Sequence, residues 1–99
     1  MNPIEELMQV IDQMPLETTT IDCINLLLQH LNSPLRLPTN AATLSEALPS
    51  YYDLASLPQR MQQPWESLAP LDKALVALVC YLQTNNATFG CEQQQQQQP

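Results

Sequence analysis

The chain has 99 residues, enough for one small domain, and ten acidic residues against three basic ones give it a net charge of −7. Phosphate backbones and anionic lipid surfaces would repel this charge, so we expect the chain to bind neither nucleic acid nor a membrane. Seventeen leucines against one glycine and one phenylalanine favour helices over strands. The composition predicts an all-α fold, a bundle of about four to five helices.

The first predicted helix follows Asn2. Asparagine is a favoured N-cap, and Pro3 fits the first helical position because its missing N–H would have no partner there. Apolar residues then recur at helical spacing as far as Pro15, which ends the helix. The polar side of this helix is expected to carry three carboxylates: Glu5, Glu6 and Asp12.

The second predicted helix starts in the threonine run at residues 18–20 and stops at residues 32–34, since the residue before Pro34 is disfavoured in helical geometry. Its apolar stripe should face the core. Three polar side chains should point outward: Asp22, Asn25 and Gln29.

The middle of the chain, from Ser33 to Pro70, is rich in proline, which limits any helix there to two or three turns. Thr43 and Ser50 each precede a carboxylate by three residues and so predict two short capped helices. Tyr51 is expected to cover the core. The range from Gln59 to Ser67 is expected to be a polar linker.

The last predicted helix begins at Pro70 and closes at residues 85–86. It is apolar on every side, so it should lie at the centre of the bundle or be covered by a partner, which makes Val76 and Tyr81 candidate contacts. We expect residues 1–90 to form a single helical domain and the Gln-rich tail, residues 91–99, to be disordered because it has nothing to bury.

The sequence predicts no catalytic residue, cofactor site or metal site. Cys23 and His30 lie roughly 10 Å apart along one helix, too far to share an ion without a third element. Glu5 and Glu6 are adjacent and point about 100° apart, so they do not converge on one substrate. An odd number of cysteines and an acidic start where a secretory signal would be basic predict a reduced cytoplasmic protein.

We therefore expect a non-enzymatic protein–protein interaction module: an adaptor, an assembly factor or a regulatory subunit, with homo-oligomerisation as another use of the same surfaces. An alternative is an acidic inhibitor or decoy that occupies a basic groove on an enzyme or DNA-binding protein. A small metal protein or enzyme is a third hypothesis. The candidate partner-binding residues are Tyr52, Trp65, Val76, Tyr81, Glu5, Glu6 and Asp12.

Overall fold

Helices make up the regular structure of residues 2–85, the part of the chain that this computed structural model describes. Within that range there are five α-helices, two 3₁₀-helices and no β-strand, so the prediction of a small all-α fold is confirmed. The elements in chain order are α1 (Pro3–Asp12), α2 (Thr20–His30), α3 (Leu44–Ala47), η1 (Leu54–Ser56), α4 (Leu57–Arg60), η2 (Trp65–Ser67) and α5 (Pro70–Asn85).

The first helix begins after its predicted cap, Asn2, and the second begins within the predicted threonine run. The side chain of Asn2 accepts a hydrogen bond from the backbone N–H of Glu5 (2.8 Å), and Thr19 accepts one from Asp22 (3.1 Å). Each bond satisfies an amide that the first helical turn leaves without an intrahelical partner. Both starts follow from local sequence, because a cap acts over only three residues.

The C-terminus of α2 is closed by its backbone geometry. Asn32 adopts a left-handed conformation (φ 62°), its N–H donates to the carbonyl of Gln29, and the N–H of Ser33 donates to the carbonyl of Leu28 (both 3.0 Å). This pair of bonds is a Schellman motif, and asparagine tolerates the positive φ it needs better than most residues with a Cβ. The helix stops where the sequence predicts, and Asn32 rather than the proline makes the stop.

The first short helix of the middle segment, α3, has the predicted cap. The Thr43 hydroxyl accepts a hydrogen bond from the N–H of Glu46 (3.2 Å), and the Glu46 carboxylate accepts one from the N–H of Ala42 (3.2 Å). The two bonds resemble a capping box and stabilise a helix of only four residues.

The next helical segment begins later than the sequence predicts. Ser50 is not a cap: residues 49–52 form a turn, and η1 starts after Asp53, whose carboxylate accepts a hydrogen bond from the N–H two residues on (3.2 Å). α4 follows with Pro58 in its first turn, where no N–H is needed. The predicted polar linker from Gln59 to Ser67 contains the end of α4 and all of η2.

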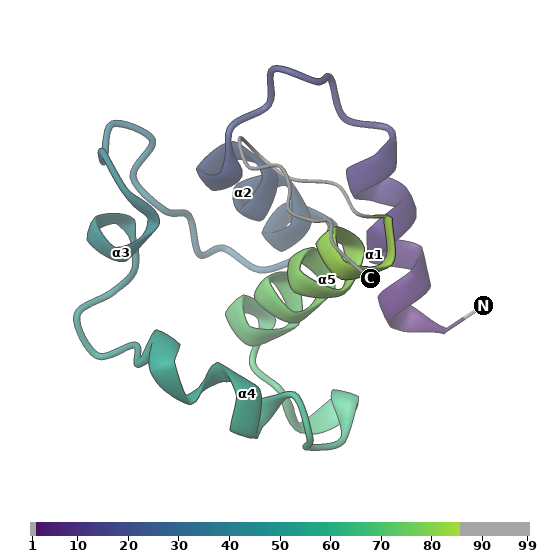
Figure 1. The fold of residues 1–99 in the computed structure, drawn as a ribbon. Coiled ribbons are helices and arrows are strands. Elements are labelled where there is room, and N and C mark those ends of the chain that lie inside the picture. The colour runs from purple at the N-terminus through teal and green to yellow at the C-terminus, as the bar shows by residue number, and fades with distance from the viewer. Residues whose placement is uncertain (1, 86–99) are drawn as a thin grey trace, which may run out of the picture.

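α5 lies at the centre of the fold, with α1, α2 and α4 packed against it (Figure 1). Its expected central position is confirmed. Val76, which the sequence offers as a candidate contact for a partner, is instead buried and only 4% exposed. The buried apolar residues of this helix lie on all its sides, because neighbours cover each of them: Leu71, Ala74, Leu75, Val76, Ala77 and Leu78.

A long irregular segment, residues 31–43, joins α2 to α3 and is tied to α2 by Asn25. The Asn25 amide donates to the carbonyl of Leu37 (3.1 Å), and its oxygen accepts the N–H of the same residue (2.7 Å). The prediction that Asn25 points away from the protein is therefore wrong. Its two bonds hold Leu37 in the core, where that side chain is 3% exposed.

No helix within residues 2–85 is long and apolar enough to cross a membrane. The Gln-rich tail, which the sequence predicts to be disordered, lies outside the described residues.

Candidate functional site

A cleft of about 510 Å³ opens between the segment that precedes α4 and the N-terminus of α5. Its walls are mainly apolar and include Leu35, Pro70 and the exposed ring of Tyr51, while its floor is polar and includes Tyr52, Arg60 and Asp72. We call it the tyrosine cleft. The complete lining is Ser33, Leu35, Tyr51, Tyr52, Asp53, Arg60, Ala69, Pro70, Leu71 and Asp72.

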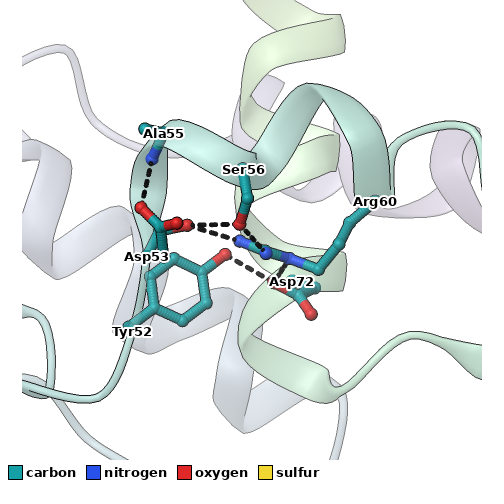
Figure 2. Close-up of polar contacts among 6 residues, drawn as sticks. All are labelled: Tyr52, Asp53, Ala55, Ser56, Arg60 and Asp72. Atoms are coloured by element: carbon teal, nitrogen blue, oxygen red, sulfur yellow. Dashed lines mark hydrogen bonds and ion pairs between the residues drawn. The ribbon is translucent and has the colours of Figure 1, made fainter.

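The floor of the tyrosine cleft is a hydrogen-bonded network centred on Asp72 (Figure 2). One carboxylate oxygen of Asp72 accepts hydrogen bonds from the Tyr52 hydroxyl (2.5 Å) and from Nε of Arg60 (2.8 Å). The guanidinium of Arg60 also donates to the Ser56 hydroxyl, and to the backbone carbonyl of Asp53 at 2.9 Å. It lies 4.8 Å from the centre of the Tyr52 ring. Three separate segments of the chain are thereby held together.

The charges of this network compensate each other. Asp72 is 7% exposed at the third position of α5, where the helix dipole and an arginine partner both favour a carboxylate. Burial, followed by the hydrogen bond to Asp72, raises the pKa of Tyr52 to about 12. At neutral pH the phenol is therefore protonated and donates. In the floor one positive and one negative side chain pair through hydrogen bonds that help to hold the shape of the cleft.

Tyr51 and Tyr52 have opposite environments although they are adjacent. Tyr51 is 80% exposed at the edge of the cleft, so the prediction that its ring covers the core is wrong. Tyr52 is half-buried and packs against the core. The turn at residues 49–52 directs only Tyr52 toward Asp72, and nothing in the local sequence distinguishes the two rings.

A second concave region lies between α1 and α5, and three predicted contact residues meet there. Glu5, Asp12 and Tyr81 line a hollow of about 310 Å³ together with Met8 and Gln9, which we call the acidic hollow. The Tyr81 hydroxyl donates to the Asp12 carboxylate (3.2 Å). Burial and then this hydrogen bond raise the pKa of Tyr81.

The remaining predicted residues lie apart from both regions. Glu6 is on another side of α1, where its carboxylate is 3.7 Å from Nε2 of His30, so Glu5 and Glu6 diverge as their helical spacing predicts. Trp65 is half-buried against the core, with Nζ of Lys73 5.7 Å from the centre of its ring.

The described residues contain no group of three histidine, cysteine or acidic side chains arranged to hold a metal. Cys23 is fully buried, and burial raises the pKa of its thiol to about 11, which disfavours the nucleophilic thiolate. His30 is exposed and contacts Glu6 instead. The tertiary structure does not bring Cys23 and His30 into one site.

Sequence reasoning missed Arg60 and Asp72, the two charged residues of the cleft floor. Asp72 has a sufficient local explanation at a helix N-terminus, which hides its second role. A weak signal for Arg60 was its rarity, since the chain has only three basic residues.

No protein-family model matches this chain, and no curated protein or solved structure was found to be similar to it.

Proposed function

We propose that this chain is a non-enzymatic protein-interaction module that binds a segment of a partner protein in the tyrosine cleft. The observation that carries the proposal is Tyr51, an aromatic side chain 80% exposed beside the apolar walls of a cleft. Tyrosine is enriched among residues that dominate binding energy, because its rigid ring covers a large area for little loss of rotamer entropy. In this role the chain would serve as an adaptor, an assembly factor or a regulatory subunit.

The network below the cleft supports the same proposal. Arg60, Asp72 and Tyr52 already hold one another, so a partner would not have to order the floor when it binds. Preorganisation of this kind increases affinity by reducing the entropy lost on association. The charges of Arg60 and Asp72 compensate each other, which leaves the exposed carboxylate of Asp53 as the one uncompensated charge among the lining residues. With mainly apolar walls, the cleft suits an apolar or aromatic segment better than an acidic one.

A photo-crosslinking amino acid at position 51, expressed in the native host, tests the proposal. We expect one discrete adduct with a partner protein from position 51 and none from the same residue at the exposed Thr39, which lies outside the cleft. Tyr51→Ser should lose the partner while circular dichroism shows an unchanged fold. A chain that remains monomeric and forms no adduct at position 51 would contradict the proposal. An adduct with a second copy would identify a homo-oligomer.

The acidic hollow favours a second candidate function, that of an inhibitor or decoy for a basic groove. Each basic side chain of the chain contacts groups within the fold: Arg36 donates to backbone carbonyls, Arg60 pairs with Asp72, and Lys73 lies over an aromatic ring. The carboxylates of α1 therefore have no lysine or arginine beside them among the described residues. A partner with a positive surface would be attracted to them.

Salt dependence separates the two candidate functions. A complex formed through the acidic hollow should weaken steeply between low and high ionic strength, and Glu5→Gln combined with Asp12→Asn should weaken it further. A complex formed through the tyrosine cleft should change little with salt and should respond to Tyr51→Ser instead.

A further inference from the structure

A surface shared by α1, α2 and the turn between them exposes apolar side chains outside both regions described above. Leu16 is fully exposed in the turn, and Leu26 is 42% exposed on α2. Val10 and Met14 of α1 are half-buried beside Leu26 and line a hollow of about 440 Å³ with it. We call these four residues the leucine face.

Leu26 separates two hollows. The second, of about 380 Å³, lies on its other side and is lined by Pro15, Thr18, Asn25 and Arg36 among others. Single exposed leucines are common in folded proteins and need no explanation. Leu26 lines both hollows, and Leu16 directly follows Pro15, which lines the second. Exposed apolar side chains gathered beside hollows in this way mark an interaction site. A ridge with a groove on each side also matches the way in which helices pack on one another.

The charges around the leucine face are mostly negative. Asp22 lines the second hollow, and Glu17 follows Leu16 in the turn. His30 lines the first hollow, and its contact with Glu6 places that carboxylate at the border of the hollow. The one arginine here, Arg36, uses its guanidinium to bind the backbone carbonyls of residues 33 and 35 (both 2.6 Å).

We propose that the leucine face binds an amphipathic helix of a partner protein, one whose apolar stripe is bordered by lysine or arginine. Apolar side chains of that helix occupy the hollows on either side of Leu26, and its basic residues approach Asp22, Glu17 and Glu6. Charge complementarity selects this occupant over a second copy of the chain, because a second copy would place the same acidic border against this one and carries a net charge of −7 itself. The inference goes beyond the proposed function, since it concerns another surface and another partner chemistry.

The test uses two synthetic helical peptides of about 18 residues with leucine at amphipathic spacing, one with lysine on its borders and one with glutamate. Fluorescence anisotropy should show that the lysine peptide binds the full chain at least about tenfold more tightly than the glutamate peptide. Leu26→Ser should weaken lysine-peptide binding about tenfold or more. Leu16→Ser, at a fully exposed position that cannot disturb the core, should weaken it about threefold.

Two control variants keep this test specific. Leu54→Ser removes a leucine of comparable exposure (36%) on η1 and should change lysine-peptide affinity by less than about twofold. Tyr51→Ser should also leave the affinity for the lysine peptide unchanged. The test of the leucine face is therefore independent of whether the tyrosine cleft binds a partner. The inference is overturned if both peptides bind equally, if neither binds, or if Leu26→Ser binds like the parent chain. Self-association that Leu26→Ser abolishes would also overturn it.

Discussion

Asp72 joins three segments of the chain, and its replacement by alanine should destabilise the fold by about 2–4 kcal/mol. A hydrogen bond to a charged acceptor contributes about 1.5–3 kcal/mol, and Asp72→Ala removes the one from Tyr52. It also leaves the guanidinium of Arg60 without its anion. Breaking a fully buried ion pair costs about 3–5 kcal/mol, but the Arg60 side chain is 21% exposed and keeps two other acceptors, so only part of that cost applies.

Urea denaturation followed by far-ultraviolet circular dichroism measures this loss. A domain of this size has a total stability of roughly 5–10 kcal/mol, so the midpoint should move by a large fraction of its value while the slope stays unchanged. Glu66→Gln is the matched control, because it removes one exposed carboxylate from the neighbouring η2 and should change stability by less than about 0.5 kcal/mol.

A double-mutant cycle separates the network from a simple effect of charge. Asp72→Ala and Tyr52→Phe remove the same hydrogen bond, so their combined effect should fall short of the sum by about 0.5–3 kcal/mol. A loss below about 1 kcal/mol for Asp72→Ala, or additive effects of the two changes, would refute the assignment of Asp72 as the centre of the cleft floor.

Three further outcomes follow from burial and hydrogen bonding. Val76→Asp places a charge in the core and should unfold the chain, and Leu78→Ala should lower the free energy of unfolding by about 2–5 kcal/mol. Circular dichroism measures both effects. A Val76→Asp chain that stays folded would mean that this side of α5 is open. Asn25→Ala leaves the N–H and the carbonyl of Leu37 without these partners and should lower the free energy of unfolding by about 1–3 kcal/mol. Limited proteolysis within residues 31–43 should become faster. Unchanged proteolysis would contradict the anchoring role of Asn25. The pKa values of Cys23 and Tyr52 rise to about 11 and about 12 in the folded chain. The folded state therefore retains protons that the unfolded state releases, so stability should be complete below about pH 9 and fall as pH rises toward 12. Tyr52→Phe should flatten the upper part of that fall in pH-dependent denaturation, and an unchanged profile would count against the buried phenol.

The helices could be predicted because their signals are local. Asn2, Thr19 and Thr43 each cap a helix through a bond that spans three residues, and the apolar pattern of α5 predicts its central position. The prediction was wrong at Ser50, which looks like a cap in the same way that Asp53 does. With the helical segment starting after Asp53, Tyr52 and Arg60 both reach Asp72. Asp72 lies twelve to twenty residues further along the chain, so a local pattern does not distinguish the two possible starts.

The candidate sites were predicted less well, and unequally. Glu5, Asp12 and Tyr81 could be named from their residue type and helix face, but their meeting in one hollow depends on how α1 packs on α5. Val76 was named as a candidate contact because a helix that is apolar all round offers no polar side that would identify its inward face.

By itself, the sequence determined the helical class of this protein, the starts of its first three helices, the stop of α2 and the negative charge of its surface. These properties depend on composition and on contacts within one or two turns of chain. Only the tertiary structure decided that Tyr51 is exposed while Tyr52 is held, that Asn25 binds Leu37, and that Arg60 and Asp72 form the floor of a cleft. These features pair groups that are twelve to twenty residues apart. Such a pairing forms only when tertiary packing brings the two segments together, and no local pattern in either segment encodes its distant partner.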